Sequence, residues 1–165
     1  MKTIKLIIAC LFVSAYSFAN ISSTEKDALL ALYNSTNGDK WNVTWDITTD
    51  VNTWHGIQIE NNEIVEINLQ FNNLQGTLPA EIGNLISLRK MNLGFNKLTG
   101  QLPTTLQNLK ELKSLELFMN GFEGAIPSEL GSLKNLESLK LYSNRLSGTI
   151  PESLMELTNL KELLL

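Results

Sequence analysis

The segment LRKMNLGFNKLTGQLPTTLQNLKE, residues 88–111, decides the fold, because its framework recurs before and after it at steps of 24 residues. The same step separates four asparagines, four glycines and all four prolines of the chain. A fixed period of about 20–30 residues is typical of a solenoid, in which each unit buries its apolar face against its neighbours. The period predicts full units over 64–87, 88–111, 112–135 and 136–159, and a further unit that begins at residue 160.

Each unit opens with a short apolar pattern that predicts a strand. In the quoted unit Leu88, Met91 and Leu93 are expected to point inward. Stacked strands about 4.8 Å apart predict a parallel sheet of roughly five strands. An asparagine follows where the chain leaves the strand, and its amide can both donate to and accept from backbone groups of the turn. We therefore predict a structural role for this asparagine column, which contains Asn72, Asn96, Asn120 and Asn144.

A glycine and a proline follow in every unit, as Gly100 and Pro103 do in the quoted segment. Glycine permits a tight turn or a close backbone approach, whereas proline fixes φ and lacks an N–H donor. Together they interrupt any long helix. The side of the solenoid opposite the sheet is therefore predicted to be extended or to hold short 3₁₀ segments.

The remaining strand side chains alternate to the other face of the sheet, where they vary from unit to unit. Because the framework is fixed, we expect this concave face to carry specificity and to bind a protein or peptide. Exposed apolar area and aromatic anchors are typical of interaction sites. The candidate binding residues are Glu66, Asn68, Gln70, Lys90, Asn92, Phe95, Glu116, Phe118, Lys140 and Tyr142.

The aromatic side chains of this face have two interpretations. Phe71 and Phe95, which precede the asparagine, either pack against the equivalent ring of the next unit or contact a partner, and the sequence leaves both open. For Phe118 and Tyr142 we favour partner contact over a core role. Met119 extends the same apolar stripe.

The shared pattern L-x-x-L-x-L-x-x-N-x-L-x-G-x-[LI]-P resembles the leucine-rich repeats of the 24-residue class, familiar from plant receptor ectodomains and from secreted bacterial and protist proteins. The resemblance spans residues 64–165. It implies an α/β fold: a right-handed solenoid with a parallel sheet on its concave face, 3₁₀ or extended segments on its convex face, and a helical N-terminal cap.

Residues 26–63 resemble the cap that precedes such repeats, through a helical segment and the sequence Trp54-His55-Gly56-Ile57. The plant cap carries paired cysteines around that tryptophan, whereas the single cysteine of this chain lies at position 10. This departure favours the bacterial or protist variety over a plant receptor kinase.

The N-terminus reads as an export signal. Residues 1–19 combine a short basic stretch, an apolar run and small residues before Asn20, which predicts a signal peptide cleaved there. Lipidation at Cys10 is the less favoured alternative. The cap then covers residues 20–63 and begins with a helix expected from Thr24 to Ser35, since Ser22 and Glu25 have the spacing of a capping box.

All three tryptophans lie within the cap, at positions 41, 45 and 54. One interpretation is an aromatic pocket for a glycan or an apolar ligand. We favour the other, in which the rings cover the open apolar end of the first repeat, because large rings with one polar atom suit an edge that is dry on one side. His55, the one histidine, is expected to be a loop residue, since neither metal-ligand nor calcium-loop spacing surrounds it.

Charge and motif content exclude several function classes. Residues 20–63 carry two lysines against seven acidic residues, and residues 64–165 carry nine basic against ten acidic residues. An acidic chain without a basic patch lacks the footprint of a nucleic-acid-binding protein. We find no nucleophile–base pair, metal-ligand cluster or phosphate-binding loop. We therefore expect no cofactor, no metal and no enzymatic activity.

The leading functional hypothesis is a secreted or cell-surface module that binds a protein or peptide, with a glycan as a less favoured ligand. The alternatives are the ectodomain of a membrane receptor and the targeting arm of a larger exported enzyme. The sequence stops within a repeat, so we expect more chain beyond residue 165, and membrane association only through such a segment. Asn20, Asn34 and Asn42 begin Asn-x-Ser/Thr triplets that a eukaryotic secretory pathway could glycosylate.

Overall fold

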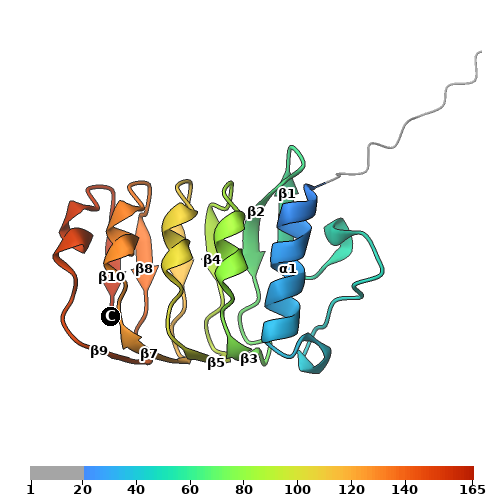
Figure 1. Cartoon of the computed structure of the whole chain (residues 1–165), viewed down its shortest axis with the longest axis horizontal. Coiled ribbons are helices and arrows are strands. Elements are labelled where there is room, and N and C mark those ends of the chain that lie inside the picture. Colours follow the sequence, from blue (N-terminus) through green and yellow to red (C-terminus); the bar gives the residue numbers. More distant parts are fainter. Residues whose placement is uncertain (1–20) are drawn as a thin grey trace, which may run out of the picture.

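The computed structural model describes residues 21–165, which form a solenoid with one α-helix at its N-terminal end (Figure 1). The predicted signal peptide and the Asn20 triplet lie outside the described residues. Among residues 21–165, no helix has the length and apolar character needed to cross a membrane.

Helix α1, Ser23–Ser35, begins one residue before the predicted start, and its capping box is confirmed. The Glu25 amide donates to Ser22 Oγ at 3.2 Å, and the Ser22 amide donates to Glu25 Oε2 at the same distance. The other carboxylate oxygen, Oε1, accepts from the backbone N–H of Ile64 at 2.9 Å. One buried side chain thus caps the helix and fastens it to the first repeat.

The main sheet has six strands in the order β1 (Ile57–Glu60), β2 (Glu63–Asn68), β4 (Lys90–Asn92), β6 (Ser114–Glu116), β8 (Ser138–Lys140) and β10 (Glu162–Leu164). The last five pair in parallel, each in register with the residue 24 positions further on, which confirms the predicted parallel sheet. Strand β1 pairs antiparallel with β2, so the cap contributes one strand that the repeat pattern does not contain.

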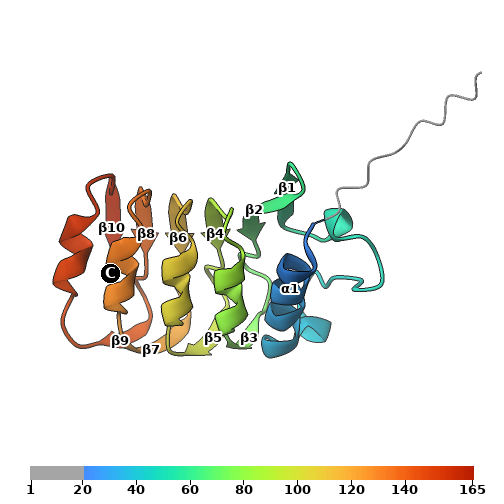
Figure 2. The same cartoon turned by 45° about the horizontal axis from the view of Figure 1, so that its top comes forward.

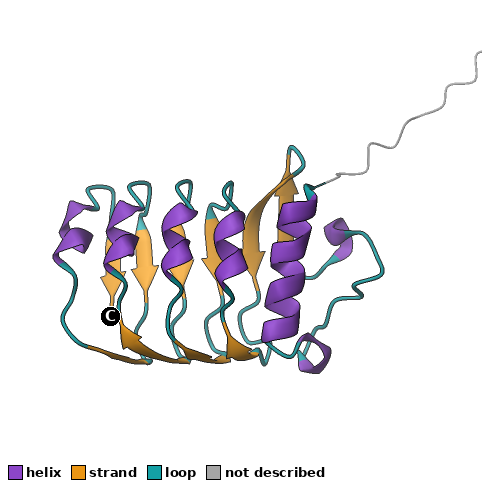
Figure 3. Cartoon of the chain, in the orientation of Figure 1, coloured by secondary structure: helices purple, strands orange, loops and turns teal. Residues whose placement is uncertain are grey.

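Short 3₁₀ helices line the side opposite the main sheet, as predicted (Figure 3). Each one directly follows a proline of the repeat, whose carbonyl oxygen accepts the first turn's hydrogen bond. They are η3 (Ala80–Asn84), η4 (Thr104–Asn108), η5 (Ser128–Ser132) and η6 (Glu152–Glu156). Two further 3₁₀ turns, η1 (Gly38–Lys40) and η2 (Val51–Thr53), lie in the cap.

A second sheet, which the sequence analysis did not predict, joins the two sides along one edge of the solenoid (Figure 2). It pairs β3 (Gln75–Thr77), β5 (Lys97–Gly100), β7 (Gly121–Ala125) and β9 (Arg145–Ser147) in parallel. The repeat glycines lie in or beside these strands with positive φ, for example 78° at Gly100 and 81° at Gly124. Positive φ favours glycine at these positions. The expected close backbone approach is confirmed at Gly76, where a Cβ atom would overlap the Ser35 carbonyl oxygen.

One continuous apolar core runs through the solenoid, and the inward strand residues of every full repeat belong to it. At the cap end, Trp41, Trp45 and Trp54 are also buried, with ring centroids 4.7–4.8 Å apart in successive pairs. Each indole N–H donates to a backbone carbonyl within the cap. The rings thus close the end of the core, and they leave no open aromatic surface for a glycan.

Candidate functional site

The candidate site is the outward face of the main sheet, where the side chains of β2, β4, β6 and β8 and of the turns behind them form columns across the strands. Nine of the ten predicted residues are exposed or partly exposed, and they come from adjacent repeats. The structure therefore brings them onto one surface. Phe118 differs, because only 6% of its surface is accessible.

Charged side chains on this face alternate in sign from strand to strand and lie close to one another. Lys90 Nζ is 3.7 Å from a Glu66 carboxylate oxygen, and Lys140 Nζ lies 3.5 Å from Glu116 and 3.2 Å from Glu162. The hydrogen bond to Glu162 raises the pKa of Lys140, although partial burial acts against it. Hydrogen bonds from Lys140 and Ser138 lower the pKa of Glu162. The charges balance one another, so the face offers a partner no strong field of either sign.

Four aromatic side chains form a continuous row along the lower part of the face, and we call them the aromatic ladder: Phe71, Phe95, Phe118 and Tyr142. The first two rings stack with centroids 4.0 Å apart, the next pair meets edge to face at 5.3 Å, and the last pair stacks at 5.0 Å. Both of the open interpretations of Phe71 thus have support, because its ring packs on its neighbour while 58% of the residue stays exposed.

We expected the Phe118 ring to contact a partner more readily than the Phe95 ring, and its burial corrects that expectation. A Cβ atom added to Gly94 would lie 2.7 Å from the Phe118 ring. The ring therefore occupies the space that a side chain at position 94 would fill, and Tyr142 covers it from the next repeat. Phe118 supports the surface from below.

The residue before each asparagine has a left-handed backbone, a feature that sequence reasoning missed. The φ angles are 58° at Phe71, 53° at Phe95, 51° at Met119 and 56° at Ser143. Residues other than glycine, asparagine and aspartate seldom adopt this conformation. No composition signal marks the position, since it holds neither glycine nor a constant residue type. Its fixed place in the period is the one available signal.

The asparagine column fixes the backbone beneath the aromatic ladder, as predicted. Asn96 Oδ1 accepts from the backbone N–H groups of Asn72 and Leu74 in the preceding repeat, and its amide nitrogen donates to three carbonyls within 3.2 Å. Asn120 and Asn144 also bond across repeat boundaries. Each asparagine therefore connects two repeats.

Asn72 is the exception within the column, because the element before it is the cap. Its amide donates to the Val43 carbonyl at 3.1 Å, and its Oδ1 accepts from the Val43 N–H at 2.7 Å. The first asparagine thus holds the cap loop against the first repeat.

Potential metal ligands do not cluster among the described residues. Within residues 21–165, no set of three or more His, Cys, Asp or Glu side chains could hold a metal ion. His55 is an exposed loop residue, as expected.

Comparison with known proteins places this geometry in a family. The Leucine Rich Repeat family model matches residues 63–85, 87–109, 111–133 and 135–157. The chain belongs to the leucine-rich repeat family. Its repeats are of the 24-residue plant type, and its solved structural neighbours include plant receptor ectodomains of the same solenoid fold.

Three of these neighbours illustrate the likeness. The BIR2 ectodomain from Arabidopsis thaliana is 30% identical with a TM-score of 0.77, over 87% of this chain and 78% of that one. The BIR3–SERK2 complex, also from Arabidopsis thaliana, matches at 29% identity and a TM-score of 0.71, over 82% and 77%. The PEPR1–AtPEP1 structure matches at 34% and 0.77, over 84% of this chain and 20% of the other chain. The leucine-rich repeat protein described here therefore spans about a fifth of that larger chain.

Proposed function

We propose that this protein is a secreted or cell-surface module that binds a protein or peptide through the outward face of its main sheet. Two neighbours support this proposal, since one is a complex of BIR3 with SERK2 and the other is PEPR1 with AtPEP1. The same likeness supports an extracellular site of action. It also supports a role without catalysis of its own.

The observation that carries the proposal is the contrast between a constant framework and a variable face. The inward residues are leucine, isoleucine or methionine in every full repeat and are fully buried or nearly so. The outward columns change in charge, size and polarity between adjacent repeats. Stability alone requires no such variation. A framework that is held rigid also lowers the entropic cost of binding.

The dimensions of the face favour an extended ligand or a long edge of a protein. Five parallel strands at about 4.8 Å spacing place the two outermost strands about 19 Å apart. A segment of five or six extended residues covers that length. We expect a ligand to contact both the Glu116–Lys140 pair near the middle of the face and the apolar side chains beside it.

The second candidate function is that of a membrane-receptor ectodomain. Its support is that BIR2 and SOBIR1, both similar in fold over 87% of this chain, are described as ectodomains, the latter of a receptor kinase. A targeting arm of an exported enzyme is the third possibility raised by the sequence, and none of the neighbours named here favours it.

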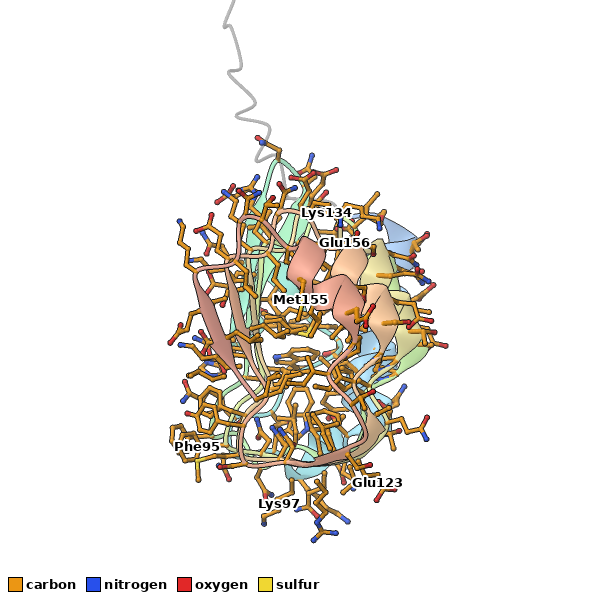
Figure 4. The ribbon with its side chains drawn as sticks, turned by 90° about the vertical axis from the view of Figure 1, so that its left-hand side faces the viewer. Phe95, Lys97, Glu123, Lys134, Met155 and Glu156 are labelled. Carbon is orange, nitrogen blue, oxygen red and sulfur yellow. The ribbon has the colours of Figure 1, made fainter. Side chains whose placement is uncertain are left out.

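A selection from a displayed library of random peptides tests the proposed function. Clones that bind the purified protein are re-tested on the double variant Glu116→Gln/Lys140→Gln, which neutralises one pair on the sheet face. The matched control is Lys134→Gln/Glu156→Gln, which removes a pair 2.8 Å apart on the opposite side. Figure 4 shows that Lys134 and Glu156 lie far from Phe95.

We expect the selected clones to lose about tenfold in affinity on the sheet-face variant and to be unchanged on the control, because contacts at the centre of an interface dominate its energy. Equal effects of the two variants would place binding elsewhere. Failure to select any clone would count against peptide binding altogether.

A further inference from the structure

The corner where the two sheets meet holds a hollow that is lined by both apolar and polar residues and lies beside the strand columns. It has a volume of about 380 Å³, and its apolar lining is Phe71, Phe95 and Met119. Met119 is 41% exposed, and Phe71 is more so. Figure 4 shows Phe95 and Lys97 at this corner, away from the 3₁₀ helices. We call this feature the corner hollow.

The backbone beneath the corner hollow is strained at each apolar residue. Phe71, Phe95 and Met119 all adopt the left-handed conformation, which costs about 1 kcal/mol for a residue with a Cβ atom. Glycine would remove that cost. Burial does not offset it at Phe71 and Met119, since both are exposed. Strained backbone that presents exposed apolar side chains is typical of interaction sites.

Lys97 is the one charged residue in the lining of the corner hollow, and the other polar residues there are asparagines whose amide groups bond within the protein. The Asn42 amide donates to the Phe71 carbonyl at 2.8 Å, the Asn73 amide donates to the Lys40 carbonyl at 2.9 Å, and the Asn96 side chain is used in the asparagine column. Lys97 is exposed and takes part in no ion pair of residues 21–165. No acidic side chain lines the hollow.

We infer that the corner hollow binds an extended acidic peptide segment in which a large apolar side chain stands next to a carboxylate. The apolar side chain packs on the Phe71 and Phe95 rings and on Met119, and the carboxylate reaches the Lys97 ammonium. A basic residue at the same place would be repelled by that ammonium. The inference rests on the proposed function, because it names the partner chemistry for one part of the same surface.

Methionine methyl NMR tests the inference on the whole protein, because its methionines sample distinct environments. Met119 lines the hollow, Met91 is fully buried in the core, and Met155 is exposed on η6. The probes are the synthetic peptides acetyl-Phe-Asp-Phe-Asp-amide and acetyl-Phe-Lys-Phe-Lys-amide. We expect the acidic peptide to shift the Met119 methyl signal in a saturable way while the other two signals stay in place.

The charge preference is checked with the variant Lys97→Glu. We expect the unchanged protein to bind the acidic peptide at least about fivefold more tightly than the basic one, and the variant to bind the basic peptide more tightly by a similar factor. The matched control is Arg145→Glu, since Arg145 occupies the same repeat position two units further on and begins β9. We expect that variant to bind like the unchanged protein.

Several results would overturn the inference. These are equal shifts with both peptides, equal shifts at Met119 and Met155, no shift with either peptide, or an unchanged preference in Lys97→Glu. A failure of this inference can be distinguished from a failure of the proposed function. If library clones depend on Glu116 and Lys140 but ignore Lys97→Glu, the sheet face binds peptides and only the inference about the corner hollow is wrong.

Discussion

The described part of the N-terminal cap, residues 21–63, and the repeats from residue 64 onward share one core but are held by different kinds of contact. In the cap each contact occurs once, such as the stacked Trp45 and Trp54 rings or the Glu25 carboxylate on the Ile64 amide. In the repeats the same contact recurs every 24 residues, as the asparagine column does. The comparison teaches that a periodic stack needs a non-periodic end, because its first repeat has no preceding repeat to cover it.

The largest expected effect comes from breaking the unique part of the core. Trp45→Ala removes a ring that stacks on Trp54 and meets the edge of Trp41, and we expect it to lower the free energy of unfolding by about 4 kcal/mol. Urea denaturation measures this loss. Trp45→Phe keeps an aromatic ring and should lose about half as much; equal losses would mean that the ring contacts are unimportant.

The recurring contacts can be ranked by position. Asn96→Ala leaves five backbone groups without the bonds its amide makes, in a nearly buried place, and we expect a loss of about 3 kcal/mol. Asn144→Ala affects three groups around a more exposed side chain, and about 1 kcal/mol is expected. Chemical denaturation of both variants compares them. Identical losses would show that the repeats are energetically equivalent despite their different exposure.

A smaller effect is expected at the contact between Gly94 and the Phe118 ring of the next repeat. Gly94→Ala places a methyl group against the Phe118 ring, and we expect a loss of about 1–2 kcal/mol from the displaced ring. The double variant Gly94→Ala/Phe118→Leu should recover part of that loss in denaturation experiments. If Gly94→Ala is neutral, the burial of Phe118 does not depend on the glycine.

The smallest expected effect is a loss of folding stability at acidic pH. Hydrogen bonds and nearby charge from Lys161 and Lys134 lower the pKa values of Glu137 and Glu156, as Lys140 and Ser138 lower that of Glu162. A carboxyl whose pKa is lower in the folded state stabilises the fold above about pH 4.5, its ordinary value, and this contribution disappears as the pH falls through the lowered pKa.

All three carboxyls lie in the last repeats, whereas the one cap carboxyl with a lowered pKa, Asp46, lies outside α1, so those repeats should lose amide protection before α1 does. Hydrogen exchange at pH 5 and pH 3 compares residues 137–164 with α1. The screened, exposed pairs predict a modest change, and Glu137→Gln should reduce its pH dependence. Earlier loss of protection in α1 would contradict this prediction.

The sequence was sufficient for the parts of the fold that repeat or that follow a local rule. Leu88, Met91 and Leu93 revealed the inward side of a strand, the asparagine column revealed the turn, and Ser22 with Glu25 revealed the start of α1 within one residue. These features depend on residues close together in the chain. Their physics can be stated without knowledge of the neighbouring repeat.

The features that escaped sequence analysis depend on backbone geometry or on a neighbour 24 residues away. The second sheet is made by backbone groups of residues such as Thr77 and Thr99, whose side chains show no apolar alternation. The burial of Phe118 is decided by the missing side chain of Gly94 in another repeat. The left-handed backbone at Met119 has no residue-type signal at all. For these reasons the candidate face could be located from the sequence, while its accessible side chains could not be ranked.

The bonds that asparagine side chains make across repeat boundaries also have a mechanical consequence. A load applied along the solenoid passes from one repeat to the next through these bonds and through the backbone bonds of the two sheets, so the repeats are loaded in series. Each repeat that opens releases 24 residues, which extend to about 80 Å. Stretching a single molecule should therefore give unfolding events that each increase its extension by about that length. The cap, which the tryptophans close, should unfold with an increase of a different length.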